Sequence, residues 1–201
     1  MTEAALLDRI ETRQRRSLPA AVRAINTEAR TVELSFSSEM SYPRYWGNEI
    51  LDHSPSSVRL GRLNNGGAVL VDHDTADHVG VVERAYIGPD RKGRALVRFG
   101  KSQRAAEVFG DVADGIRSLV SVGYRIHDMQ LESSNAQDGE TYRVIDWEPY
   151  ELSVVSVPAD PSVGVGRSTT FGEHRMETTE LSRGERRAAS GGNHTDPRAE
   201  I

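Results

Sequence analysis

Cysteine is absent from this chain of 201 residues. Its absence excludes a disulfide scaffold, a zinc–thiolate site and a cysteine nucleophile. Long hydrophobic runs are lacking too, because no apolar stretch approaches the roughly 20 residues that cross a bilayer. The N-terminus also lacks the apolar segment of a secretory signal. We therefore expect a protein that begins in a cytoplasm and has no membrane partner.

An excess of positive charge is missing as well, since the net charge is −5. The basic residues are scattered, and the aromatic residues do not line one strand face as a base-stacking platform requires. We therefore expect no nucleic-acid partner. A metal site could be built from Asp72, His73, Asp74 and His78, but no strand or helix spacing brings these side chains together. We expect neither a metal nor a cofactor.

Alternating apolar and polar residues dominate the middle of the chain and predict strands. A hairpin is expected over residues 22–36, with its turn at 26–30. A buried strand follows at 68–71, and further strands are expected at 79–87, 94–100, 116–129, 141–147 and 151–157. The fold class is therefore β-rich α+β, and we predict a single small β-barrel of about seven strands with one or two flanking helices.

Two segments have helical periodicity. Residues 2–16 place Leu6, Leu7 and Ile10 on one stripe, and residues 102–114 begin at Ser102, a good N-cap, and end before Gly115. Residues 168–201 have almost no large apolar side chains, which predicts a disordered tail. We therefore divide the chain into an N-terminal helical arm (1–17), a β domain (18–167) and a disordered tail (168–201).

A small hydroxyl residue stands inside the strand predicted near residues 116–126. Side chains alternate between the faces of a strand, so Ser121 and Gly123 share one face, and the glycine removes bulk beside the serine. A histidine, His73, lies at the end of the buried strand 68–71, and Glu151 opens the last strand. Serine needs a neighbouring base to become a nucleophile, and a carboxylate orients an imidazole base well.

These residues make a candidate catalytic triad of Ser121 as nucleophile, His73 as general base and Glu151 as the acidic member. Several neighbours compete for the same roles, and the third member remains open between Glu151, His127 and Asp74. The other competitors are Ser118 for the nucleophile, His78 for the base, and Asp72, Asp146 and Glu148 for the acid.

Four short motifs occur in order along the chain: His73-Asp74, Val79-Gly80-Val81-Val82, Ser121-Val122-Gly123-Tyr124 and Glu151-Leu152-Ser153-Val154-Val155-Ser156-Val157-Pro158-Ala159. Together they resemble the caudovirus prohead serine protease family, whose fold is related to that of the herpesvirus assemblins. The resemblance implies a serine endopeptidase in which His73, Ser121 and Glu151 act as base, nucleophile and third member. Leu119-Val120 departs from the Gly-Leu or Gly-Met that precedes the serine in many members.

The resemblance also implies a biological setting. The protease would act in the host bacterial cytoplasm inside the immature capsid, or prohead, where it cleaves scaffold segments, the N-terminal part of the major capsid protein and itself. Its partners would be the major capsid protein and scaffold segments, and the related assemblins suggest a homodimer. Residues 168–201 would then be a self-cleavage segment or a tether. The alternative hypothesis is a catalytically silent scaffold or capsid-assembly factor with the same barrel fold.

Overall fold

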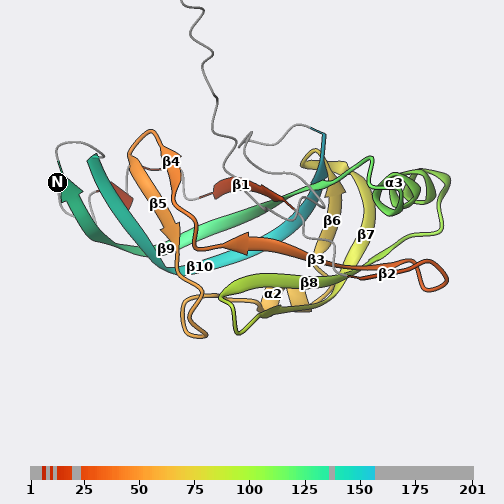
Figure 1. Ribbon diagram of the computed structural model, residues 1–201, viewed down its shortest axis with the longest axis horizontal. Coiled ribbons are helices and arrows are strands. Elements are labelled where there is room, and N and C mark those ends of the chain that lie inside the picture. The colour runs from red at the N-terminus through yellow and green to blue at the C-terminus, as the bar shows by residue number, and fades with distance from the viewer. Residues whose placement is uncertain (1–5, 8–9, 11–12, 20–23, 136–138, 157–201) are drawn as a thin grey trace, which may run out of the picture. The chain divides into compact units, whose positions relative to one another are not determined.

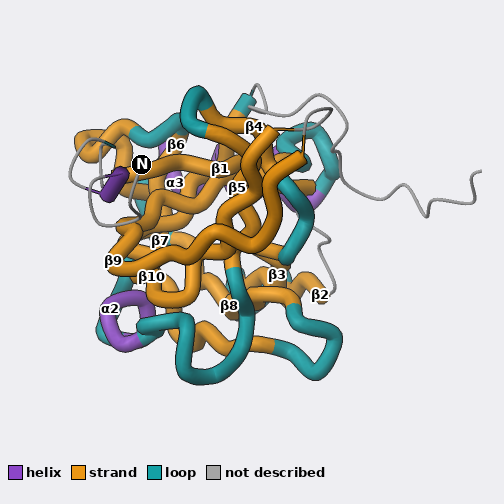
Figure 2. The backbone as a smooth tube through the Cα atoms, turned by 90° about the vertical axis from the view of Figure 1, so that its left-hand side faces the viewer, coloured by secondary structure: helices purple, strands orange, loops and turns teal. Residues whose placement is uncertain are grey.

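The structure is a computed structural model that describes residues 6–7, 10, 13–19, 24–135 and 139–156. These residues belong to one compact unit, Met1–Ser168, and a second unit, Thr169–Ile201, lies outside the described residues together with the predicted tail. Within the described part, strands make up most of the backbone and helices are few (Figures 1 and 2).

All ten strands belong to one mixed sheet in the order β1–β9–β10–β6–β7–β8–β3–β2, with β5 paired to β10 and β4 to β5. The pairs of β10 with β5 and β6 are parallel, and the others are antiparallel. The bounds are β1 (Arg13–Pro19), β2 (Ala24–Asn26), β3 (Thr31–Ser38), β4 (Tyr42–Arg44), β5 (Gly47–Leu51), β6 (Ala68–Val71), β7 (Asp74–Ile87), β8 (Lys92–Phe99), β9 (Leu119–Asn135) and β10 (Gly139–Val155).

The sheet bends around its core but does not close into the predicted barrel. Val32 and Phe36 of β3 belong to the same buried cluster as Val120 and Val122 of β9, although five ladder steps separate these strands in the sheet. Among the described residues, the ladder ends at β1 on one side and β2 on the other, and these two strands do not pair. The β-rich class is therefore confirmed, while the closed seven-stranded barrel is replaced by an open ten-stranded sheet.

Helix α3 (Gln103–Ala113) confirms the predicted second helix. The Ser102 hydroxyl accepts a hydrogen bond from the Ala105 N–H, and Gly115 has φ +73° just beyond the helix end. Its buried side chains, among them Val108 and Phe109, join the core. A single turn, α2 (Gly61–Asn64), precedes β6 and buries Leu63. No helix in the described part of the chain is long and apolar enough to cross a membrane.

The N-terminal segment differs from the prediction, because residues 13–17 are not helical but belong to strand β1. Residues 1–5, 8–9 and 11–12 of the predicted helix lie outside the described residues. The segment pairs with β9 from Arg13 opposite Arg125 to Pro19 opposite Leu119. Hydrogen bonding along the edge of an existing sheet satisfies this backbone, which overrides the weak helical pattern of a short arginine-rich segment.

The predicted strands 141–147 and 151–157 belong to one continuous strand, β10, so the predicted break between them is wrong. One edge of β10 pairs with β5 and, further along, with β6, and between these two segments the Trp147 N–H donates to the Ser57 carbonyl. The N–H groups of a strand point to the same edge at every second residue, so an N–H at position 149 would point to this edge too. No strand pairs with the edge at that position, and proline, which has no N–H, is therefore tolerated there. A further hairpin, β4 and β5, lies between the predicted hairpin 22–36 and the predicted strand 68–71, where the sequence pattern predicts no strand.

Candidate functional site

Ser121 lies near the start of β9, between two serines of the neighbouring strands. The ladder places it directly opposite Ser17 of β1 and Ser153 of β10. Its neighbours Val120 and Val122 point to the opposite face and are buried in the core. The β9 strand therefore separates an apolar core face from a polar face, and the candidate site lies on the polar face.

His73 is held by a tight turn that joins β6 to β7. Asp72 and His73 both have left-handed backbone conformations, with φ +48° and +63°. Such conformations are uncommon outside glycine, although Asp and His tolerate them better than most residues. The turn is tied to β10, because the Asp72 N–H donates to the Val154 carbonyl and the Asp72 carboxylate accepts from the Ser156 N–H. These bonds hold the imidazole above the polar face.

The three predicted residues form a continuous hydrogen-bonded chain. The Nε2 atom of His73 lies 2.7 Å from the Ser121 Oγ, and its Nδ1 atom lies 2.7 Å from the Glu151 Oε1. A neutral ring in this position donates from Nδ1 to the carboxylate and accepts the serine proton at Nε2. Geometry of this kind raises the nucleophilicity of a serine and stabilises the imidazolium that forms when it loses its proton. The catalytic roles themselves stay a prediction.

Ser153 is a further member of the site that the sequence reasoning missed. Its hydroxyl donates to the Glu151 Oε2 at 2.8 Å and accepts from the His73 N–H at 3.2 Å. It therefore fixes the carboxylate and the strained turn together. Its position two residues after Glu151 on a strand, and hence on the same face, was the available signal.

A bulge in β10 brings Glu151 into position. The register shifts between Pro149 and Glu151, so that Tyr150 and Glu151 both lie beside Gly123 of β9. A Cβ atom at position 123 would lie 2.2 Å from the Glu151 Oε1 and 2.8 Å from the Tyr150 Cε2. Burial and the charge of Glu151 raise the pKa of the Tyr150 hydroxyl. Gly123 thus leaves room for the acid, in agreement with the prediction that it removes bulk beside Ser121.

The site is largely shielded from water. Ser121 and Ser153 are fully buried, and Glu151 is 6% exposed. Hydrogen bonds among these groups are stronger in such an environment than they are in water.

The competing candidates lie outside this chain of bonds. His78 Nε2 donates to the Gly80 carbonyl, and His127 Nε2 lies 4.0 Å from the Glu148 carboxylate. Asp74 accepts from the Ala76 N–H, and Asp146 pairs with Arg59. Among the described residues, no group of three His, Asp or Glu side chains is placed to hold a metal ion.

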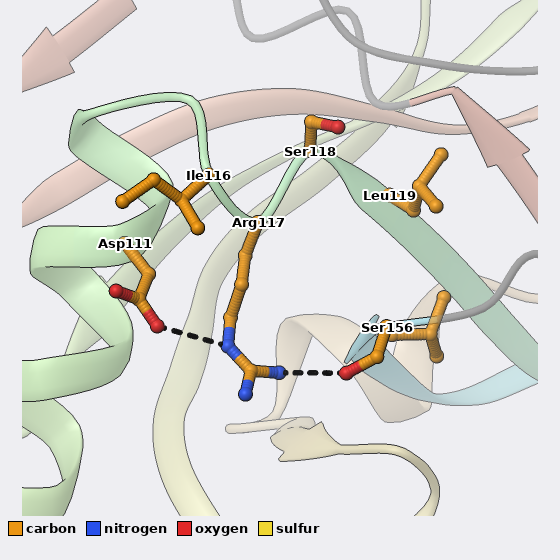
Figure 3. A pocket seen from close by; sticks show the side chains of 7 residues that line it. Asp111, Ile116, Arg117, Ser118, Leu119 and Ser156 are labelled. Carbon is orange, nitrogen blue, oxygen red and sulfur yellow. Dashed lines mark hydrogen bonds and ion pairs between the residues drawn. The ribbon is translucent and has the colours of Figure 1, made fainter.

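A cavity of about 230 Å³ lies where α3, the start of β9 and the end of β10 meet (Figure 3). Leu119 and Val155 form its apolar side, and they are a register pair two residues from the Ser121–Ser153 pair on the same face. Arg117 crosses it, with Nε donating to the Asp111 carboxylate at 3.1 Å and Nη1 to the Ser156 hydroxyl at 3.2 Å. Its remaining lining residues are Ile116 and Ser118.

Two comparisons with known proteins find similarity to phage proteins. The model of the caudovirus prohead serine protease family matches residues 50–179. The chain is also 46% identical over 139 residues to a protein named major capsid protein from Halomonas phage phiHAP-1. That match covers 68% of this chain and 23% of the relative, so the chain spans about a quarter of the relative's length. No solved structure matches significantly.

Proposed function

Because this chain belongs to the caudovirus prohead serine protease family, we propose that it is a serine endopeptidase of phage capsid maturation. It acts inside the prohead in the host cytoplasm and cleaves scaffold segments, the N-terminal part of the major capsid protein and its own chain. The observation that carries this proposal is the hydrogen-bonded chain from Glu151 through His73 to Ser121. The relative named major capsid protein supports a setting in capsid assembly.

In the acylation step, the Ser121 Oγ attacks the carbonyl carbon of the scissile bond while its proton passes to His73 Nε2. The resulting imidazolium is stabilised by Glu151, whose Oε1 is already placed at Nδ1. Collapse of the tetrahedral intermediate breaks the C–N bond, and His73 gives its proton to the leaving amine. A water molecule, deprotonated by the same nitrogen, then hydrolyses the acyl-enzyme and releases Ser121.

Two features of the site fit this reaction. The Ser153 hydroxyl keeps the Glu151 carboxylate in one orientation while the imidazole changes charge. The cavity beside Leu119 and Val155 accommodates a substrate side chain adjacent to the scissile bond. The bond to be cleaved lies over the polar face of β9, with the apolar core behind it.

The test is the intact mass of the purified chain over time, alone and mixed with the capsid protein of the phage that encodes it. Wild-type protein should shorten itself or the capsid protein at defined bonds, and Ser121→Ala should leave both intact. Ser134→Ala, which changes an exposed serine far along the same strand, is the matched control and should cleave as the wild type does. Absence of cleavage in every sample would favour the silent assembly factor.

A further inference from the structure

Most arginines in the described part of the chain pair with a carboxylate within 4.0 Å. Six described arginines have no such partner among the described residues: Arg13, Arg15, Arg30, Arg62, Arg84 and Arg125. We refer to four of them, Arg13, Arg15, Arg62 and Arg125, as the arginine patch. They come from three different elements: β1, α2 and β9. All four lie near the candidate triad, although the protein as a whole has a net charge of −5.

The register of β1 and β9 places three of these arginines on the face of Ser121. Arg15 lies opposite Gly123, and Arg13 lies opposite Arg125. Side chains repeat every two residues, so positions 121, 123 and 125 share one face, and their partners on β1 share it too. Gly123 and Arg125 are therefore about 7 and 14 Å from Ser121 along the strand, at about 3.4 Å per residue.

Tyr150 brings the fourth arginine to the same place. The Tyr150 ring and the Glu151 carboxylate both lie where a side chain at position 123 would begin. The positive charge of Arg15 acts on the Tyr150 hydroxyl and partly offsets the rise in its pKa, and the Arg62 guanidinium lies 5.9 Å from the centre of the Tyr150 ring. Both guanidinium groups thus border the Glu151 end of the triad.

The charges of this patch are incompletely balanced. Arg13 and Arg125 are directly opposite each other, and like charges in that position destabilise a sheet. Glu148 stands opposite Arg125 on the other side, but its carboxylate lies within 4.0 Å of His127 rather than of an arginine. Glu151 is occupied by His73 and Ser153. An anionic ligand would therefore relieve repulsion that the described residues leave unbalanced.

We propose that the arginine patch binds acidic side chains of the peptide substrate, two to four residues from the scissile bond. This inference rests on the proposed protease function. An extended peptide advances about 3.3 Å per residue, so a carboxylate two residues from the attacked carbonyl reaches Arg15, and one four residues away reaches Arg13 and Arg125. Guanidinium groups bind carboxylates with paired hydrogen bonds, which makes arginine well suited to such recognition. The patch also attracts acidic segments to an otherwise acidic enzyme.

Cleavage specificity provides the first test. A proteome-derived peptide library is digested with the wild type, and the cleaved sequences are read by mass spectrometry. Asp and Glu should be enriched two to four residues from the cleaved bond. In R15E/R125E that enrichment should fall by roughly tenfold, with Lys and Arg favoured instead. Arg84→Glu is the matched control, since Arg84 stacks on Tyr86 in β7 and has no carboxylate partner among the described residues. Cleavage without acidic enrichment would overturn the inference and leave the protease function intact.

Binding provides a second test that does not depend on turnover. Ser121→Ala is titrated by fluorescence anisotropy with a ten-residue peptide that carries Glu at two alternate positions, and with the same peptide carrying Gln. We expect the Glu peptide to bind roughly tenfold more tightly at low salt, with the difference shrinking as salt screens the charges. Equal affinity for both peptides would reject the inference, whether or not the wild type cleaves. The inference would also be rejected if a DNA oligonucleotide bound strongly through Arg15 and Arg125 and the Glu peptide were not preferred over the Gln peptide. The patch would then be a nucleic-acid site.

Discussion

The Glu151 carboxylate occupies the space in which a side chain at Gly123 would begin. A Cβ atom there would lie 2.2 Å from the Glu151 Oε1, the same oxygen that bonds His73 Nδ1 at 2.7 Å. The glycine two residues after the proposed nucleophile therefore acts on the opposite end of the triad. Strand β9 thus carries the serine, and its glycine leaves the space that the Glu151 carboxylate occupies.

Gly123→Ala should displace Glu151 from His73 and lower kcat/KM by at least tenfold, with little change in fold. The clash involves the end of a side chain, which can rotate away, rather than backbone. Steady-state kinetics with circular dichroism would measure both effects. Gly110→Ala on α3 is the matched control, because a Cβ there meets nothing within 4 Å and should slightly stabilise the helix. Full activity in Gly123→Ala would refute the spatial argument.

Glu151→Gln should lower kcat by a factor on the order of 10² to 10⁴, because an amide no longer stabilises the imidazolium and permits the wrong ring tautomer. The measurement is single-turnover cleavage with an unchanged melting temperature as the fold control. Asp146→Asn, a change at the neighbouring acid that pairs with Arg59, should cleave normally. Retained activity in Glu151→Gln would remove Glu151 from the triad.

Ser153→Ala should slow cleavage by roughly tenfold, less than the loss in Glu151→Gln. The change frees one carboxylate oxygen and leaves the part-buried His73 N–H without its acceptor, while the two triad hydrogen bonds remain. Ser153→Thr, which keeps the hydroxyl, should recover part of the rate. If alanine and threonine variants were equally slow, packing rather than the hydroxyl would account for the loss.

His53 should make stability depend on pH between 7 and 5. Burial lowers the pKa of this histidine to about 4, and its neutral ring lies between the Ser37 hydroxyl and the Leu51 carbonyl. Below pH 6.5 His53 therefore binds a proton in the unfolded state but stays neutral in the folded state, so stability decreases as pH falls. The free energy of unfolding in urea should drop by about 2 kcal/mol from pH 7 to 5.

His53→Gln should lose most of that slope. Asp52 and Glu39 also have lowered pKa values, but depressed carboxyl groups lose their contribution only as pH falls below their ordinary values of 3.8 and 4.5. Their effect therefore lies outside the measured window. Identical slopes for His53→Gln and the wild type would show that another group is responsible.

The sequence predicted the local parts of the site well, because each depended on a short-range rule. Alternation placed Ser121 and Gly123 on one face, the apolar run 68–71 placed His73 at the end of a buried strand, and Ser102 marked the start of α3. The order of strands in the sheet was not accessible in the same way, since it depends on contacts between distant segments. The prediction of a closed barrel failed for that reason.

Two local errors have identifiable physical causes. Residues 13–17 look helical in isolation, yet an available sheet edge makes them strand β1. Pro149 lies in the predicted break between strands 141–147 and 151–157, but β10 continues through it because one edge of β10 has no ladder partner there. The bulge at Tyr150, which the pattern of residues does not reveal, then brings Tyr150 and Glu151 beside the same glycine. The position of Glu151 depends on this bulge, and the positions of Arg13 and Arg15 in the arginine patch depend on strand β1.

The central claim is that His73 and Glu151 activate Ser121 as a nucleophile. A fluorophosphonate probe tests it directly, because the serine oxygen displaces fluoride and forms a stable phosphonyl ester only when a base removes its proton. Peptide mapping after labelling should find the adduct on Ser121 in the wild type, with none in Ser121→Ala and at least a hundredfold slower labelling in His73→Ala. Labelling of another serine, or equal labelling of Ser121 in wild type and His73→Ala, would contradict the account.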